Sequence, residues 1–269
     1  MLLQKVLLFS LMALLVPQAA QTSKQELNDQ LFEAVRKGDA AGVTAALDKG
    51  ADVNAKFRYG TTALFKAAER GHVDVAKILL DRGADVKVKD TFYQATAMTW
   101  ALDNKHVGVV KLLLEKSAED VDNVLLTGTR EGNPDLVKIA LDRGGVSADN
   151  LTAALVLAGE EKNAAITDML TKAGAKPPVQ VDEATLQTYA GKYKGDPGPE
   201  ATFTVQGGKL MIMVVGMTRQ PLSLIALDNT TFRPLAFGGI KLTFNVEGGK
   251  ATGVALKQGG QTTQLKRID

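Results

Sequence analysis

Cysteine is absent from this chain of 269 residues. Its absence excludes disulfides, a lipid-modified cysteine, a thiol nucleophile and thiolate metal sites. An excess of charge is also lacking, because 32 Lys and Arg residues face 30 Asp and Glu residues, for a formal net charge of +2. No dense basic run is present. Binding to nucleic acid, which needs concentrated positive charge, is therefore not indicated.

The apolar run near the N-terminus is short. It extends from Val6 to Val16, follows Lys5, and precedes the small residues 19–20. Spanning a bilayer takes about twenty residues, so this layout is typical of a secretory signal peptide. An uncleaved anchor or a buried helix is the alternative. We predict a signal peptide over residues 1–20 and, since an exported chain without disulfides suits that compartment, a periplasmic or secreted location in a bacterial envelope.

A pattern with a fixed period fills much of the chain after this leader. Gly38 recurs as Gly71, and the tetrapeptide that begins at Gly50 recurs at Gly83, in each case thirty-three positions later. Such a period points to stacked helical repeats. The clearest copy is residues 60–86, GTTALFKAAERGHVDVAKILLDRGADV.

That copy resembles the ankyrin repeat, and the resemblance covers residues 28–175. We expect Thr62 to cap the first helix with its hydroxyl, Gly71 to form the turn between helices, and Gly83 to end the second helix. The three-four spacing predicts one apolar stripe on the second helix. It consists of Val73, Ala76, Leu79, Leu80 and Gly83.

Five copies of the repeat are expected. The first lacks the opening turn, as a capping repeat would, and the third has one inserted residue near Phe92 and Tyr93. The fourth (132–144) and fifth (153–175) are shortened, so we expect them to keep the helix pair and lose most of the hairpin finger. The Thr-Pro-Leu-His motif of the family is replaced at 62–65 by Thr-Ala-Leu-Phe, which predicts an array less stable than a consensus one.

Ankyrin arrays bind partners with their fingertips and the exposed side of the first helix. The resemblance maps this surface onto two neighbouring repeats. Tyrosine and arginine often carry interface energy, and here they meet on adjacent fingertips. Packing of the fingers through Phe57 and Phe92 is the structural alternative, and Trp100 is expected to be buried. The predicted partner-binding residues are Arg58, Tyr59, Thr61, Glu69, Arg70, Phe92, Tyr93 and Asp103.

Catalytic chemistry is not indicated. His72 and His106 are the only histidines and occupy equivalent positions of successive repeats, so the repeat itself explains them. His72 and Asp74 are too close along one turn to act as base and orienter, and no serine lies near them. We therefore predict a protein that is not an enzyme and has no cofactor or metal.

The period changes after two consecutive prolines in residues 176–181, which we predict to be a linker. Beyond it, alternating segments are separated by paired glycines, which are hairpin signals. They predict seven or eight antiparallel strands in residues 182–269, closed into a small barrel or half-barrel. The segment Leu210 to Met217 either lines a pocket for an apolar ligand or forms core.

Residues 182–269 also resemble the small β-domain that follows the catalytic module of many serine β-lactamase-like proteins. The likeness lies in residues 186–193 (LQTYAGKY), the hairpin at 207–210, Thr231 and Phe232, residues 242–244, and the closing strands. The function of that domain is unknown. No serine here is followed three residues later by lysine, so the nucleophile and base of that family are missing.

The predicted fold is thus an α+β multidomain chain, an α-solenoid of about five ankyrin repeats followed by an antiparallel β-barrel. The predicted function is an exported, monomeric interaction module that binds a protein partner, without a membrane span once the signal is cleaved. The alternative is an envelope protein that binds a small ligand in its β-domain and uses the repeats as adaptor.

Overall fold

The computed structural model describes residues 23–235 and 238–269. It contains two compact units, divided between Asp120 and Val121, which are described in turn. The predicted signal peptide, residues 1–20, lies outside the described residues. Within the described part of the chain, no helix combines the length and apolar character needed to cross a membrane.

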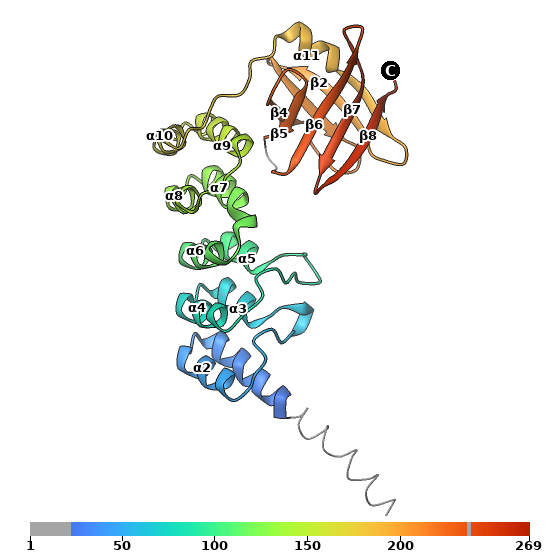
Figure 1. Ribbon diagram of the computed structural model, residues 1–269. Coiled ribbons are helices and arrows are strands. Elements are labelled where there is room, and N and C mark those ends of the chain that lie inside the picture. Colours follow the sequence, from blue (N-terminus) through green and yellow to red (C-terminus); the bar gives the residue numbers. More distant parts are fainter. Residues whose placement is uncertain (1–22, 236–237) are drawn as a thin grey trace, which may run out of the picture. The chain divides into compact units, whose positions relative to one another are not determined.

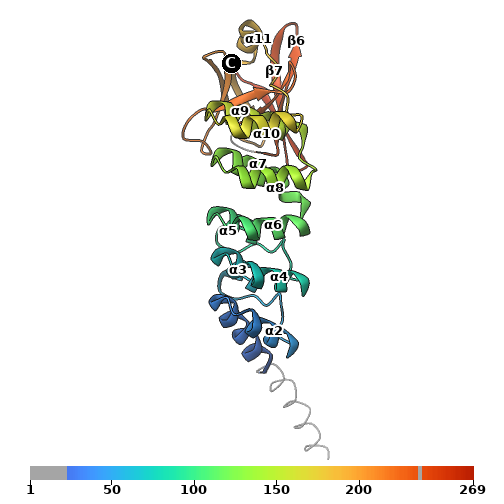
Figure 2. The ribbon, with the colours of Figure 1, turned by 90° about the vertical axis from the view of Figure 1, so that its left-hand side faces the viewer.

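The described part of the first unit, residues 23–120, contains three helix pairs (Figure 1). The pairs are residues 23–37 with α2 (Ala40–Asp48), α3 (Ala63–Arg70) with α4 (Val73–Asp81), and α5 (Ala97–Asp103) with α6 (Val107–Lys116). The first helices of the second and third pairs, α3 and α5, pack on each other. The second helix α4 contacts the second helices of both neighbouring pairs, α2 and α6. Figure 2 shows these pairs as successive layers. A short 3-10 turn, η1 (Arg58–Gly60), lies in a finger, and another, η2 (Ala118–Asp120), follows α6.

The second unit begins with two more helix pairs. They are α7 (Val121–Arg130) with α8 (Pro134–Arg143), and α9 (Ala148–Glu160) with α10 (Ala164–Lys172). Again α7 packs on α9 and α8 on α10. The described residues therefore contain five helix pairs, as the sequence predicted. Only residues 144–147 separate α8 from α9, so the expected loss of the hairpin finger is confirmed there.

One turn joins the two helices of every pair. In each copy a residue one or two positions after the first helix has positive φ, and these residues are Gly38, Gly71, Lys105, Gly132 and Lys162. The next residue donates its N–H to the carbonyl five positions earlier, as from His72 to Ala67 (3.0 Å) and from His106 to Ala101 (2.8 Å). These bonds satisfy carbonyls at the helix end. The degenerate repeats thus keep the backbone turn although their sequences have diverged.

Two details of the second repeat differ from prediction. Thr62 occupies the N-cap position of α3, but its hydroxyl is buried and makes no capping hydrogen bond, whereas Thr96 does cap α5. Val73 is 41% exposed, and Val75 is buried instead. The reason is the direction of the buried face of α4, which passes through positions 75, 76, 79 and 80 and so leaves position 73 outside.

Eight antiparallel strands form a closed barrel in the second unit. Every strand pairs with the next in sequence, and β1 also pairs with β8, with Tyr193 opposite both Ala201 and Arg267. Among the described strands, this closure leaves no free sheet edge. The strands are β1 (Gly191–Gly195), β2 (Glu200–Gln206), β3 (Lys209–Val214), β4 (Leu222–Ala226), β5 (Thr231–Pro234), β6 (Ile240–Glu247), β7 (Lys250–Gln258) and β8 (Gln261–Arg267).

The barrel core contains aromatic and aliphatic side chains. A short helix, α11 (Glu183–Tyr189), covers it and packs against β2, β3 and β7. Asp182 caps this helix by accepting the N–H of Thr185 (2.9 Å). Arg267 of β8 donates to the carbonyls of Thr188 (3.0 Å) and Ala190 (2.7 Å), which fixes the end of α11 to the barrel. The buried aromatic residues are Tyr189, Tyr193, Phe203, Phe232 and Phe244.

A buried cation connects β5 to α9 within the same unit. Arg233 is 2% exposed, and its Nη1 donates to the carbonyl of Asp149 (2.9 Å) and to the side-chain oxygen of Asn150. Burial lowers the pKa of Arg233, while the carboxylates of Asp149 and Asp122 raise it. Buried charges require such partners. The sequence contained no signal for this contact.

Candidate functional site

An aromatic surface lies on the two finger loops of the first unit. Tyr59 is 52% exposed, Phe92 69% and Tyr93 68%. The ring centroid of Phe92 lies 6.2 Å from that of Tyr59 and 4.6 Å from that of Tyr93, which lies 6.2 Å from Trp100. The four rings therefore form one chain of contacts across two repeats. Large exposed apolar groups that are contiguous mark interaction sites.

The backbone holds the two fingers together. Thr91 donates its N–H to the carbonyl of Tyr59 (2.9 Å), and Gly60 approaches Thr91 so closely that an added Cβ would lie 3.1 Å from the Thr91 methyl carbon. Both Tyr59 and Gly60 have positive φ, which turns the first finger tightly. Phe57 packs on Phe32, with centroids 4.2 Å apart, and so anchors the base of that finger.

Asp90 organises the second fingertip. This residue is 3% exposed, and its Oδ1 accepts the N–H groups of Phe92 (2.9 Å) and Tyr93 (2.6 Å). Aspartate commonly forms this turn with residues two and three positions ahead. It therefore sets where the two exposed rings point. Sequence reasoning missed Asp90, although an aspartate at the start of a finger loop is a recognisable turn signal.

A hollow of about 290 Å³ opens between the rings. Trp100 borders it and is only partly buried, so the expectation of a buried Trp100 was wrong. The buried face of α5 passes through Ala97, Met98, Ala101 and Leu102, so position 100 lies at the border of that face. The residues that line the hollow are Tyr59, Thr61, Asp90, Phe92, Tyr93 and Trp100.

The structure brings together five of the eight predicted partner-binding residues. Tyr59, Thr61, Phe92 and Tyr93 line the hollow, and the Arg58 guanidinium lies 4.6 Å from the Tyr59 ring centroid. The other three do not line it. Glu69 pairs with Lys66, and its carbonyl lies 3.1 Å from Nε2 of His106. Arg70 and Asp103 are exposed near the ends of α3 and α5.

His72 and His106 have a structural role. Their rings lie over the turn glycine of the preceding repeat, since a Cβ at Gly38 would fall 2.9 Å from His72 and one at Gly71 would fall 2.5 Å from His106. The repeat therefore explains both histidines, as predicted. Among the described residues, no three His, Asp or Glu side chains are grouped as metal ligands would be.

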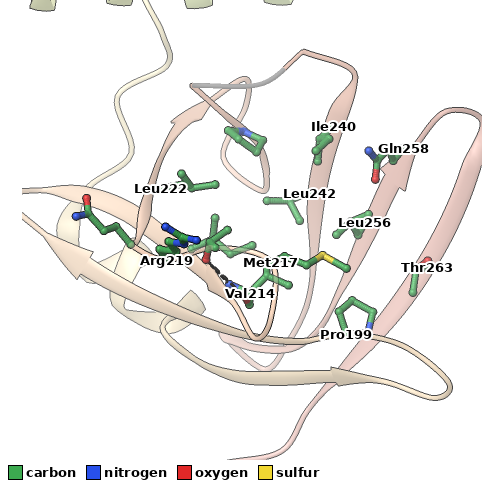
Figure 3. Close-up of a pocket in the computed structure, with 14 residues that line it drawn as sticks. Pro199, Val214, Met217, Arg219, Leu222, Ile240, Leu242, Leu256, Gln258 and Thr263 are labelled. Carbon is green, nitrogen blue, oxygen red and sulfur yellow. Dashed lines mark hydrogen bonds between the residues drawn. The ribbon is translucent and has the colours of Figure 1, made fainter. Parts of the chain in front are cut away.

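A second cavity, of about 830 Å³, lies in the barrel. Figure 3 shows the side chains of Leu222, Leu242 and Leu256 around it, with Arg219 nearby. The Leu210 to Met217 segment is divided between the two predicted roles, because Leu210 belongs to the core while Met217 is exposed and lines the cavity. The lining residues are Pro199, Ile212, Val214, Met217, Thr218, Arg219, Gln220, Leu222, Pro234, Ile240, Leu242, Leu256, Gln258 and Thr263.

The comparisons with known proteins agree with the helix pairs. Residues 31–124 match the family model of ankyrin repeats, in three copies. These residues are ankyrin repeats. No curated protein matches the chain. The matched ankyrin segment includes both aromatic fingers and the hollow between them. Because repeats of this kind present extended binding surfaces, the segment indicates a protein-interaction module.

Proposed function

We propose that the chain is an exported module that binds a protein partner through the aromatic surface of its ankyrin fingers. The observation that carries this proposal is the contiguous set of exposed rings at Tyr59, Phe92 and Tyr93, bordered by Trp100. Tyrosine and tryptophan dominate interface energies, and the hydrogen-bonded fingers would lose little conformational freedom on binding. The export part of the proposal is supported by the leader pattern of residues 1–20.

The double substitution Tyr59→Ala and Phe92→Ala is expected to weaken partner capture about tenfold or more, since each removes an anchor-sized ring. Tagged protein would be used as bait in envelope and cytosolic extracts, with mass spectrometry of what is retained and a Kd for the purified partner. The matched control is Lys77→Ala with Asp81→Ala, an exposed ion pair on α4. Unchanged affinity in the ring variant would exclude this surface, and a partner found only in the cytosol would contradict export.

A second candidate function is favoured by the barrel cavity, which suits a small apolar ligand in volume and lining. The barrel would then be the ligand-binding part, with the repeats as adaptor. The resemblance of residues 182–269 to the β-domain of β-lactamase-like proteins stays a prediction. It does not identify a ligand, because the function of that domain is unknown.

Met217→Asp is expected to weaken binding of an uncharged dye that fluoresces in apolar surroundings about threefold, because the substitution removes an apolar contact from the exposed part of the cavity lining. Dye fluorescence would be titrated with the full chain. Met213→Asp is the matched control, since Met213 lies on β3, is 40% exposed and does not line the cavity. Absence of binding by the unmodified chain, or equal loss in both variants, would remove this candidate.

A further inference from the structure

A carboxylate is buried beneath the aromatic rings of the fingers. Asp90 lines the hollow, and its Oδ1 is occupied by the two N–H groups of the fingertip. Its other oxygen, Oδ2, is also buried and, like Nε1 of Trp100, lacks a hydrogen bond of ordinary geometry among the described residues. The Trp100 N–H still acts on this carboxylate, since it lowers the pKa of Asp90. The hollow thus contains a buried carboxylate that is faced by N–H groups and by no cation of its lining.

That carboxylate carries its negative charge at neutral pH. Burial raises the pKa of Asp90, but the N–H groups of Tyr93 and Phe92 and the nearby indole of Trp100 together lower it by more, so that the pKa lies below its ordinary value. No lysine or arginine lines the hollow, and Arg58 lies against the Tyr59 ring without lining it. A negative charge therefore lies in the same hollow as several aromatic rings, whose faces are electron-rich.

The accessibility of the carboxylate decides which cation fits. Because Oδ2 is buried, an entering group would feel the field of Asp90 without a direct hydrogen bond to that oxygen. A lysine ammonium is strongly hydrated. On entering the hollow it would lose hydrogen bonds to water, and the buried Oδ2 would not replace them. The guanidinium of arginine is weakly hydrated and stacks on aromatic faces. The contact between Arg58 and Tyr59 shows that a ring of this surface accepts a guanidinium.

We infer that the hollow between the two fingers binds an arginine side chain of the protein partner, held by the faces of the aromatic rings and by the charge of Asp90. This inference rests on the proposed function, since it names the group that the partner inserts. The competing occupant is an apolar side chain, for which the rings alone would suffice. The charge of Asp90 distinguishes the two, because an apolar group gains nothing from it.

The test uses the full chain and N-acetyl-arginine methylamide. Trp100 is the only tryptophan, so its fluorescence reports on this hollow. The citrulline analogue has the same shape without the charge, the norleucine analogue represents an apolar side chain, and the lysine analogue has a different cation. We expect the arginine compound to bind about tenfold more tightly than the citrulline compound, and more tightly than the lysine and norleucine compounds.

Asp90→Asn is expected to abolish this preference for the arginine compound over the citrulline compound. Asp85→Asn is the matched control, because Asp85 also accepts a backbone N–H in its own loop, from Lys87 (2.8 Å), but is exposed and does not line the hollow. Phe92→Ala serves if Asp90→Asn fails to fold, since it removes an exposed ring and retains the carboxylate. It is expected to weaken binding of the arginine compound severalfold.

Equal affinity for the arginine and citrulline compounds, tighter binding of norleucine, or full affinity of Asp90→Asn for the arginine compound would overturn the inference. Its failure is distinct from failure of the proposed function. If the ring variant loses its protein partner but charge has no effect on the small compounds, the aromatic surface binds a partner by another group. If the arginine compound binds as expected and the ring variant still captures its partner, the hollow is a cation site outside that interface.

Discussion

Phe244→Ala is expected to lower the free energy of unfolding of the barrel by about 3–5 kcal/mol. Phe244 is 3% exposed and lies at the centre of the aromatic core. Its ring stacks on Tyr189 with centroids 4.4 Å apart and meets Tyr193, Phe203 and Phe232 at 5.9, 5.0 and 5.8 Å. Its loss would leave a void between four rings that belong to different elements, and these cannot all move to fill it.

Urea denaturation followed by far-UV circular dichroism would measure this change. Trp100 emission, recorded in parallel, reports on the first unit, which should be unaffected. Val246→Ala on the same strand is the control, because Val246 is 42% exposed and its loss should cost less than about 1 kcal/mol. A similar small effect for both variants would mean that the aromatic core does not stabilise the barrel as described.

Gly128→Ala is expected to destabilise the second unit by about 1–3 kcal/mol. Alanine normally favours a helix over glycine, but Gly128 is buried in α7 against α8. A Cβ there would lie 2.7 Å from Cβ of Leu136 and 3.0 Å from the backbone nitrogen of Val137. Backbone cannot rotate away as a flexible side chain can. The two helices would therefore have to separate, at the expense of their packing.

Gly159→Ala, in the same unit, is expected to change the stability in the opposite direction. Gly159 lies in α9, and a Cβ there meets no atom within 4 Å, so the substitution should stabilise the unit by about 0.5–1 kcal/mol through helix propensity. Thermal denaturation of both variants beside the unmodified chain would measure the difference in sign. Stabilisation by both substitutions would show that α7 and α8 are not in close contact.

The parts of the fold that depend on local backbone geometry were predictable from sequence. Turn glycines such as Gly71 and the alternation along β6 directly reflect φ and the two-residue period of a strand. Helix α11 was not expected, because its seven residues are too few for a helical period to show. The stripe assigned to Val73 failed for a similar reason, since α4 has apolar residues on more than one side.

The candidate site was predictable only in part. Tyr59 and Phe92 could be assigned to fingertips, because the repeat places them there. The role of Asp90 depends on one buried oxygen that accepts two N–H groups, and the exposure of Trp100 depends on which way α5 faces. The barrel cavity depends on which inward side chains leave space unfilled. These are properties of tertiary packing, which a single sequence does not display.

The contacts of two turn glycines, Gly38 and Gly71, with a histidine of the next repeat also bear on how repeats can be added to or removed from the array. The ring that covers Gly38 comes from the next repeat, and so does the ring that covers Gly71. The second copy thus covers the turn of the first, and the third copy covers the turn of the second. If one whole repeat were duplicated or removed, the repeats brought together would still have matching contact surfaces. Change in steps of complete repeats therefore requires the fewest new contacts in this part of the chain.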